Sequence, residues 1–391
     1  MRNVQIHRAL AASCEVRAVV FRMRDRVDPS ALPVRTSVVD KPLPRRGLRR
    51  IALRVRGLMR GRHPFLQHLA ETGAPADLAR ILAGEPADAV VLTYPCLGAF
   101  IDVARASGAR VLVDLGEART PIARRRLTGS RRPGAFLRSL GDFLVARAME
   151  RGAAGADEVW VASPAEEKWL PGEATRHLRV VPNTIEVDSY VRRPPATPPP
   201  HSVGYMGSYD YPPNVIAADR LVHRILPIMT AADPQARAIL IGRQPPADLV
   251  EEARTATNWE LRANVPDPLA DLAAAGILVV PLTAGGGTKY KILEAAASGI
   301  PIVTTSLGLQ GITLRPEEDV LVADTDEELA AAAMSLWSDP ARAARLADNA
   351  WAGVRAAYGP AALDAIVKAS LDAVLAVPRS EAAAPRAEQR A

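Results

Sequence analysis

The chain has 391 residues, more than one ordinary hydrophobic core organises, so its length predicts two domains. Lysine and arginine outnumber aspartate and glutamate by 49 to 43, and this mild excess of +6 favours an anionic partner without identifying it. Two cysteines and no secretory leader pattern argue against a disulfide framework or a cysteine metal site and predict a cytoplasmic protein. No apolar run approaches the roughly 20 residues that a membrane-spanning helix needs.

Short apolar runs in the first half of the chain predict buried strands. The runs cover residues 15–21, 88–94, 109–115, 157–163 and 178–183. Glycine, proline or asparagine bounds them, and helical stretches separate them. Because continuous apolar strands are covered on both faces, these runs predict a parallel sheet in an N-terminal Rossmann-like domain over residues 1–191.

A proline-rich segment, RRPPATPPP at residues 192–200, predicts a stiff linker, since it suits neither a helix nor a central strand. Beyond it, residues 201–358 are expected to form a second doubly wound domain. Apolar runs there again alternate with helical stretches, at residues 201–207, 237–242, 276–282 and 300–305. The expected fold class is therefore α/β, with two parallel-sheet domains. A last helix at residues 359–377 is expected to pack on the first domain, and residues 378–391 to be a disordered tail.

The segment GGGTKYKILEAAASG, residues 285–299, follows a predicted strand and has the character of an anion site. Its glycines allow positive φ and close approach of backbone N–H groups, and a helix expected from near Thr288 directs its positive end to the same place. Lys289 and Lys291 add mobile positive charge, so phosphate is the expected ligand. Glu294 shares the helical face of Lys291 and is placed to accept hydrogen bonds from a ribose diol. The alternative is an ordinary loop with solvated lysines and a weak surface ion pair.

Two arginine-rich segments predict a basic surface. Residues 45–62, RRGLRRIALRVRGLMRGR, carry eight arginines and no acidic residue, with apolar residues between them. A second cluster of arginines lies in residues 124–132. Anionic lipid headgroups suit such patches, although a solvated basic face explains the same pattern. Nucleic acid is not an expected partner, because no aromatic stacking platform accompanies the arginines.

The segment VVPLTAGGGTKYKILEAAASGIPIVTTSLGLQGI, residues 279–312, resembles the donor-binding core of group 1 glycosyltransferases, also called glycosyltransferase family 4, which have the GT-B fold. Other segments fall in the family's order and spacing, at residues 203–214, 237–245, 265–282 and 321–324. Residues 179–190 resemble the family's VPNGVD element. The resemblance implies two Rossmann-like domains facing across a cleft. It also implies transfer of a sugar from a nucleotide diphosphate sugar, with retention and without a required metal ion or cofactor. The acceptor would be lipid-linked, a polysaccharide or a small molecule.

The resemblance also implies roles for individual residues. Glu294 matches the second glutamate of the E-x7-E element, which binds the donor ribose, whereas the first glutamate of that element is replaced by Gly286. A subgroup with a GxGTxxKxLEA pattern shares this departure, and Lys291 matches its lysine. The backbone of a short run would contact the diphosphate and sugar: Gly285, Gly286, Gly287 and Thr288.

Further donor contacts are implied around the other strands of the second domain. Gly207 matches the glycine after its first strand, but from Ser208 the sequence SYDYPPN replaces the arginine and lysine pair of many relatives. Lys289, Lys291 and Arg243 are the expected substitutes for that charge. The backbone near Val265 and Pro266 is expected to hold the base.

Catalytic candidates in the first domain are Asp114 and Glu117, which follow a predicted strand near where the family keeps a sugar-contacting residue. A helix cap or a pairing with Arg119 explains either carboxylate equally well. The leaving diphosphate is expected to carry most of the chemistry, since its own oxygen can take the acceptor's proton. No histidine has the spacing of a metal ligand.

Relatives in this family open with a strand and a glycine-rich loop before a helix like VQIHRALAASCEV, residues 4–16. Because the sequence starts directly before that helix, we expect the first strand and loop to be missing. This departure keeps open a non-catalytic nucleotide-sugar binding protein or a truncated pseudoenzyme. A sugar-nucleotide epimerase of the same fold is less favoured, because no set of acid and base residues is visible for it.

Overall fold

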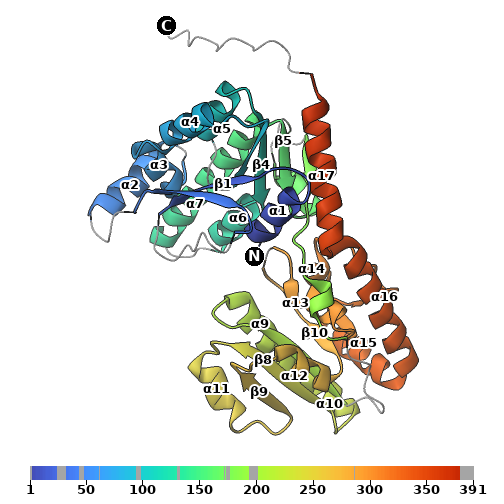
Figure 1. Ribbon diagram of the computed structural model, residues 1–391. Helices are drawn as coiled ribbons and strands as arrows, with labels where there is room; N and C mark the ends of the chain where they lie inside the picture. Colours follow the sequence, from blue (N-terminus) through green and yellow to red (C-terminus); the bar gives the residue numbers. More distant parts are fainter. Residues whose placement is uncertain are drawn as a thin grey trace. The chain divides into compact units, whose positions relative to one another are not determined.

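A computed structural model describes residues 2–23, 32–43, 48–60, 62–93, 98–129, 133–170, 172, 177–192, 201–285 and 287–378. The chain divides into two compact units, shown in Figure 1. Unit 1 comprises Met1–Val161, Glu166–Val181 and Asp364–Ala391, and unit 2 comprises Ala162–Ala165 and Pro182–Leu363. Most of the predicted linker and nearly all of the predicted tail lie outside the described residues.

Unit 1 contains a four-stranded parallel sheet in the order β3-β4-β5-β6. Its strands are β3 (Ala89–Thr93), β4 (Arg110–Gly116), β5 (Glu158–Val161) and β6 (Leu178–Val180). Each lies in a run that the sequence predicted as a strand, except that β4 extends one residue beyond its run, to Gly116. The side chains of β5 and nearly all of those of β4 are buried, which is the covering on both faces that continuous apolar runs require.

The first predicted strand does not join that sheet in the part of the chain that the structure describes. β1 (Arg17–Arg22) pairs in parallel with β2 (Arg35–Asp40) as a separate two-stranded sheet. Ala18 is the one residue of β1 that is buried, so this strand lacks the two-sided covering of a central strand. The sequence did not indicate β2, because RTSVVD mixes polar and apolar residues and is largely exposed.

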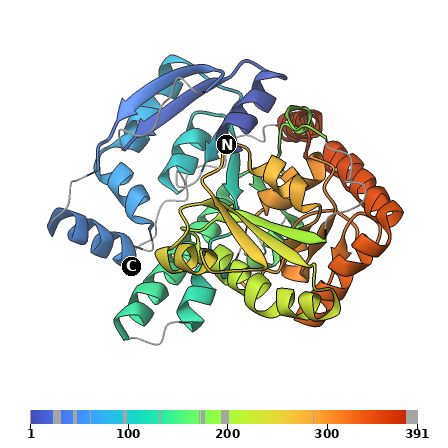
Figure 2. The same cartoon turned by 90° about the horizontal axis from the view of Figure 1, so that it is seen from below.

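Helices surround the main sheet of unit 1 in Figures 1 and 2. They are α1 (Arg2–Ala11), α2 (Leu48–Met59), α3 (Pro64–Glu71), α4 (Ala74–Gly84), α5 (Ala99–Ala106), α6 (Thr120–Thr128) and α7 (Pro133–Gly152). The core joins Leu69 of α3 and Phe100 of α5 to Val111 and Val113 of β4. Most of the last helix, α17 (Pro360–Ala376), also belongs to this unit.

A buried hydrogen-bond network attaches α17 to β5. The Trp160 indole N–H donates to the Ser370 hydroxyl at 2.9 Å, and that hydroxyl donates to Glu158. Arg179 of β6 donates to both oxygens of Glu158, at 2.6 and 3.0 Å. Since Trp160 and Ser370 are fully buried, each polar group here needs the others as partners.

Unit 2 contains a six-stranded parallel sheet in the order β12-β11-β10-β7-β8-β9. Its strands are β7 (Ser202–Ser208), β8 (Arg237–Arg243), β9 (Trp259–Ala263), β10 (Leu278–Val280), β11 (Ile302–Thr304) and β12 (Leu321–Val322). The sequence predicted four of these as apolar runs. It missed β9, whose side chains are mostly exposed or half-buried, and β12, which is two residues long.

Helices cover the sheet of unit 2 on both sides, as Figure 2 shows. They are α9 (Pro212–Arg220), α10 (Leu226–Ala232), α11 (Ala247–Ala253), α12 (Pro268–Ala275), α13 (Tyr290–Ala297), α14 (Ser306–Leu309), α15 (Asp326–Ser338) and α16 (Pro340–Tyr358). A π-helical turn, η5 (Leu221–Ile225), joins α9 to α10, where Leu226 N–H bonds to the Leu221 carbonyl. Pro227 explains the widened turn, since it has no N–H for an α-helical bond.

The strand order of unit 2 reverses between β7 and β10. From β7 the chain adds β8 and β9 on one side and then returns to add β10, β11 and β12 on the other. The loops that leave the carboxyl ends of β7 and β10 therefore diverge to opposite faces of the sheet. In open parallel sheets this reversal point is where ligands bind.

Among the described residues, no helix combines the length and apolar character required to cross a bilayer.

Candidate functional site

The loops after β7 and β10 meet at the reversal point of the unit 2 sheet. A Cβ at Gly285 would lie 3.6 Å from Pro213 Cβ and 3.7 Å from the Tyr211 hydroxyl, so the two loops are in contact there. Gly285 has φ +124° and Gly287 has φ +75°, which a residue with a side chain adopts only at a cost. Gly286 lies outside the described residues.

Helix α13 begins directly after this loop, at Tyr290. This start is two residues after the one expected near Thr288, and the N-cap residue, Lys289, makes no side-chain capping hydrogen bond. The Thr288 hydroxyl instead accepts a hydrogen bond from Asn183 Nδ2 at 2.8 Å. The small residues 295–297 are buried, and α13 packs on α16 and β11. Tyr290 N–H bonds to the Thr288 carbonyl at 3.1 Å and Ile292 N–H bonds to the Lys289 carbonyl at 2.9 Å. The helix presents its positive dipole end at the reversal point.

The Lys291 ammonium is held in a fixed position in unit 2. It donates to the Tyr205 hydroxyl at 2.8 Å and to Asn214 Oδ1 at 2.9 Å, and it lies 4.1 Å from the centre of the Tyr205 ring. Burial lowers the pKa of Lys291 to about 7, against the raising effect of the Glu294 charge. Lys291, which the sequence predicted to be a mobile cation, is therefore an anchored amine that can gain a proton near neutral pH.

Gly207 creates the space that Lys291 occupies. A Cβ there would lie 2.9 Å from Asn214 Cγ and 3.2 Å from Lys291 Nζ. Asn214 itself donates to the Ser208 carbonyl at 2.8 Å and accepts from Tyr205 at 2.9 Å. Sequence reasoning identified Gly207 and Ser208 but missed Tyr205 and Asn214, for which the pattern gave no signal except their nearness to Gly207.

Glu294 lies one turn beyond Lys291 on α13 and is half-buried. The Tyr190 hydroxyl donates to Glu294 Oε1 at 3.5 Å. Burial raises the pKa of Glu294, and burial together with the Glu294 charge raises the pKa of Tyr190 to about 12. Tyr190 therefore stays protonated and remains a hydrogen-bond donor to the carboxylate.

The other predicted donor contacts lie along the same carboxyl edge of the sheet. Lys289 is buried, and its ammonium donates to the Gln310 carbonyl beyond α14 at 3.4 Å. Arg243 is exposed at the end of β8, and its carbonyl accepts from Tyr209 N–H. Val265 and Pro266 follow β9 and precede α12. The structure thus gathers the described members of the donor set at one edge of unit 2.

The two catalytic candidates of unit 1 have different surroundings. Asp114 is 4% exposed at the end of β4 and takes hydrogen bonds from Arg2, with Nη2 at 2.6 Å and Nε at 3.0 Å. It also accepts from Gly116 N–H at 3.1 Å. Glu117 follows at a partly exposed position. Neither carboxylate caps the next helix, because Glu150 accepts from the N–H groups of residues 119 and 120 at 2.7 and 2.9 Å.

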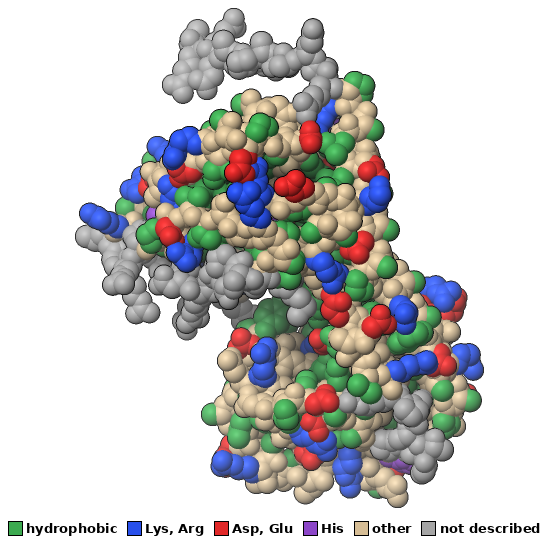
Figure 3. All heavy atoms as spheres, viewed as in Figure 1, with side chains coloured by type: hydrophobic (Ala, Val, Ile, Leu, Met, Phe, Trp, Pro, Cys, Tyr) green, Lys and Arg blue, Asp and Glu red, His purple; other side chains and the backbone are tan. Residues whose placement is uncertain are grey.

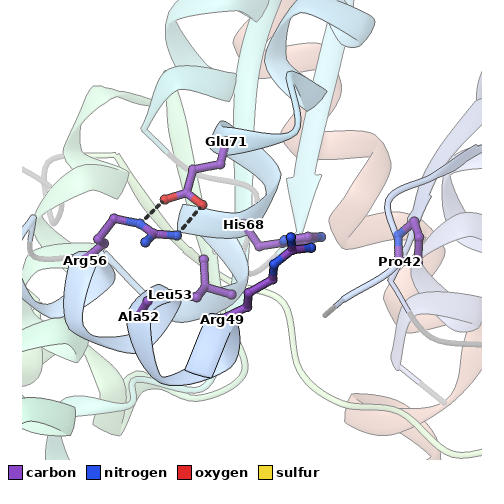
Figure 4. Close-up of a pocket in the computed structure, with 7 residues that line it drawn as sticks. All are labelled: Pro42, Arg49, Ala52, Leu53, Arg56, His68 and Glu71. Atoms are coloured by element: carbon purple, nitrogen blue, oxygen red, sulfur yellow. Dashed lines mark hydrogen bonds and ion pairs between the residues drawn. The ribbon is translucent and has the colours of Figure 1, made fainter. Parts of the chain in front are cut away.

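A separate cavity in unit 1, shown in Figure 4, has a volume of about 440 Å³. It is lined by Pro42, Arg49, Ala52, Leu53, Arg56, His68 and Glu71. Glu71 accepts two hydrogen bonds from Arg56, at 2.6 and 3.0 Å, and these bonds lower the pKa of Glu71 to about 2. None of the predicted site residues lines this cavity. Within the described ranges, no group of histidine, cysteine, aspartate and glutamate side chains could hold a metal ion.

Comparison with known proteins agrees with this geometry. Residues 200–339 match the family model described as glycosyl transferases group 1. HepE from Anabaena, crystallised in complex with UDP, superposes with a TM-score of 0.63 at 14% identity, over 95% of this chain and 96% of that chain. Sucrose-phosphate synthase from Thermosynechococcus elongatus gives a TM-score of 0.61 at 18% identity, over 95% and 92%. The lipopolysaccharide outer core galactosyltransferase WaaB gives 0.60 at 11% identity, over 95% of each chain.

No match was found among the curated protein sequences. The structural similarities, at 11% to 18% identity, establish the fold, and the family match falls on the sheet that carries the glycine loop and Lys291. The chain therefore has the GT-B fold of glycosyltransferases, and residues 200–339 in its unit 2 are similar to the group 1 glycosyl transferases.

Proposed function

We propose that this protein is a retaining glycosyltransferase whose unit 2 binds a nucleotide diphosphate sugar at the carboxyl edge of its sheet. The observation that carries the proposal is the meeting of the glycine loop, the start of α13 and the Lys291 amine at the reversal point. All three are suited to an anion. HepE, a structural neighbour, has been crystallised with UDP and with UDP-glucose, which supports the same class of donor here.

The diphosphate would lie against the backbone of residues 285–288 and the first turn of α13. The dipole of α13 favours negative charge there, and the glycines of the loop let its backbone approach a ligand closely. Lys291 and Lys289 are the nearest cationic side chains, and Arg243 at the end of β8 supplies a third. This set replaces the arginine and lysine pair that Ser208 and its neighbours lack.

The nucleoside would extend from the diphosphate along α13. Glu294 is half-buried and held by Tyr190, so its carboxylate is oriented to accept hydrogen bonds from a ribose diol. The backbone of Val265 and Pro266, between β9 and α12, would hold the base.

The chemistry we propose needs no protein nucleophile, metal ion or cofactor. As the glycosidic bond to the diphosphate breaks, negative charge grows on the leaving oxygen, and the α13 terminus and a protonated Lys291 stabilise it. The same oxygen takes the proton of the acceptor hydroxyl as the new bond forms on the same face of the sugar. In unit 1, the pairing of Asp114 with Arg2 favours a structural role for Asp114, so we propose Glu117 as the catalytic candidate of this unit.

The acceptor class we propose is a lipid-linked or polysaccharide glycan, with a small molecule as the remaining class. A lipid-linked acceptor requires the enzyme to work as a peripheral protein at the cytoplasmic face of a membrane. The arginine-rich segments at residues 45–62 and 124–132 support this placement.

The test is a calorimetric titration of the purified chain with UDP-, GDP-, ADP- and TDP-sugars. We expect one nucleotide class to bind, and Glu294→Ala to weaken that binding while the exposed Glu327→Ala control does not. Release of the nucleoside diphosphate on addition of a glycan acceptor, with the anomeric configuration of the product read by NMR, then tests transfer and retention. A folded chain that binds none of the four donors would overturn the proposal.

A further inference from the structure

We propose that the cavity of about 440 Å³ in unit 1 is a binding site for a small anionic sugar, either a sugar phosphate or a sugar acid. This cavity, called here the α2–α3 cavity, lies between α2, α3 and the segment after β2 that contains Pro42. No residue of the proposed donor site lines it, so the inference does not depend on the proposed function.

The size and the lining of the α2–α3 cavity suit such a ligand. Pockets for small molecules commonly measure about 300–1,000 Å³ and combine apolar surface with a few polar groups. Here Pro42, Ala52 and Leu53 supply the apolar surface, which can cover the C–H face of a sugar ring. The polar side chains of the lining can bind its hydroxyls and its charge: Arg49, Arg56, His68 and Glu71.

His68 offers the α2–α3 cavity a hydrogen-bond acceptor. Its side chain lines the cavity although the residue is only 6% exposed. Its Nε2 lies 3.0 Å from the Lys41 carbonyl oxygen, and since a carbonyl can only accept, Nε2 carries a proton. Nδ1 of the neutral ring is then an acceptor, and no donor for it exists within the part of the chain that the structure describes. A ligand hydroxyl can supply the donor that such a nearly buried acceptor needs.

Arg49 gives the lining a positive charge that the fold does not use. It is exposed, it forms no ion pair with any carboxylate of the described residues, and Figure 4 shows it extending from α2 toward the side of the cavity where His68 lies. Arg56, by contrast, is neutralised by Glu71. The lining therefore keeps an excess of one positive charge, and the planar guanidinium of Arg49 can bind a phosphate or a carboxylate through two parallel hydrogen bonds.

The Arg56–Glu71 pair forms a fixed polar wall of the cavity. Gln67 Nε2 also donates to Glu71 Oε1, at 2.8 Å, so two residues hold the carboxylate. Its oxygens keep free acceptor capacity, and Arg56 Nη1 takes no part in the pair. Sugar hydroxyls, which both donate and accept, suit this wall. A free phosphate ion would leave most of the volume and the apolar surface of Leu53 uncovered, and a neutral sugar would leave Arg49 without a counter-charge.

Basic side chains around the cavity add a long-range attraction for anions. Figure 3 shows basic side chains, in blue, over the end of unit 1 where α2 lies in Figure 1. Arg54 of α2 is exposed but does not line the cavity. Charges of this kind raise the local concentration of an anionic ligand without choosing among anions. The choice therefore belongs to Arg49 and His68, and Arg54 provides a matched control on the same helix.

The experiment is a calorimetric titration of the full chain with glucose 6-phosphate, glucuronate, glucose and inorganic phosphate, at about 0.15 M salt to screen distant charges. We expect one equivalent of glucose 6-phosphate or glucuronate to bind, and glucose and phosphate to bind at least about tenfold more weakly. Arg49→Gln should weaken the binding of the anionic sugar by about tenfold or more, because it removes a charge-assisted contact. Arg54→Gln should leave this binding unchanged, and so should Glu294→Ala, which alters only the proposed donor site.

NMR of the histidine side chains locates the ligand independently of affinity. The imidazole signal that disappears in His68→Gln identifies His68, and we expect this signal to shift when the anionic sugar saturates the wild type. An unmoved His68 signal at saturation would place the ligand elsewhere and overturn the inference.

The affinities decide the remaining alternatives. Unchanged binding by Arg49→Gln, equal losses in Arg49→Gln and Arg54→Gln, or no binding of either anionic sugar by the folded chain would each overturn the inference. Inorganic phosphate that binds as tightly as glucose 6-phosphate would indicate a general anion site and also overturn it. A chain that binds the anionic sugar but no nucleotide sugar would overturn the proposed function and leave the α2–α3 cavity as a sugar site.

Discussion

The protonation of Lys291 is expected to depend on whether the donor is bound. Its pKa of about 7 means that the amine of the free protein is mostly neutral at about pH 8. A bound diphosphate favours the charged form and raises this pKa, so binding above pH 7 should take up a proton. Calorimetry of nucleoside diphosphate binding in two buffers of different ionisation enthalpy measures this uptake.

The matched variant for that measurement is Lys291→Met, which keeps the length of the side chain. We expect it to bind the diphosphate more weakly and to take up no proton at about pH 8, because the titrating amine is gone. Below pH 6 the uptake by the wild type should also vanish, since the amine of the free protein is then already charged. Equal proton uptake by the variant and the wild type would assign the titration to another group.

Gly207 tests whether the space around Lys291 is needed. Gly207→Ala places a methyl group 2.9 Å from Asn214 Cγ, so we expect overpacking to cost about 1–3 kcal/mol of the free energy of unfolding and to weaken donor binding. Urea denaturation measures the first effect and titration the second. Gly84→Ala, in open space at the end of α4, is the control and should be neutral or slightly stabilising. Equal effects at the two glycines would contradict this account.

The residues of the candidate site fall into two groups, according to how far along the chain their contact partners lie. Gly207, the glycine loop, Lys291 and Glu294 could be predicted, because strand, loop and helix signals lie next to each other in the sequence. The contact of Lys291 with Tyr205 spans 86 positions, and that of Asp114 with Arg2 spans 112. No local pattern encodes such contacts, since they exist only after the sheets have formed.

At the scale of elements, Arg220 holds the segment that follows β10 in place. Its guanidinium pairs with Asp326 at the start of α15 and donates to the carbonyls of Pro281 and Asp324 at 3.2 and 2.7 Å. Arg220 and Asp326 are both buried. The arginine thus joins the α9–η5 helix to the segment that leads into the glycine loop.

Removing one partner of this pair should be costly. Arg220→Leu leaves the Asp326 carboxylate buried beside Arg224 alone, and we expect a loss of about 3–5 kcal/mol in the free energy of unfolding. The double variant Arg220→Leu/Asp326→Leu should lose less than the sum of the single variants, which a double-mutant cycle by chemical denaturation measures. Arg224→Leu, at an exposed partner of the same carboxylate, should cost at most about 1 kcal/mol. Strict additivity would rule out direct coupling of Arg220 and Asp326.

The elements that the sequence predicted share one property. Strands buried on both faces, such as β4, β5 and β8, appear as continuous apolar runs, and the structure confirms them. The missed strands are half-exposed or very short, as in β2, β9 and β12, so their pairing depends on a neighbouring strand more than on their own composition. For the same reason β1 was assigned to the wrong sheet.

At the scale of the whole molecule, α17 completes unit 1 although it is the last helix of the described residues. Ending the chain at residue 363 would remove Ser370, which links Trp160 and Glu158 of β5 to α17, and would uncover the apolar residues of unit 1 that pack against this helix. We expect this truncation to destabilise unit 1 while unit 2 keeps its stability, because unit 2 ends at Leu363. Hydrogen exchange measured separately in β5 and in β7 distinguishes the units, and equal loss of protection in both would contradict the expectation.

The route of the chain through the two units also sets the order in which they can be completed during synthesis. Unit 2 consists of residues 182–363 and a short earlier segment, so nearly all of it is synthesised before α17. Unit 1 begins first but is completed last, because Glu158 of β5 accepts a hydrogen bond from Ser370, which lies 212 positions later in the chain. Unit 1 of the nascent protein therefore has its strands but lacks the helix that packs against β5 until α17 has been made, and this interval is when we expect chaperones to bind it.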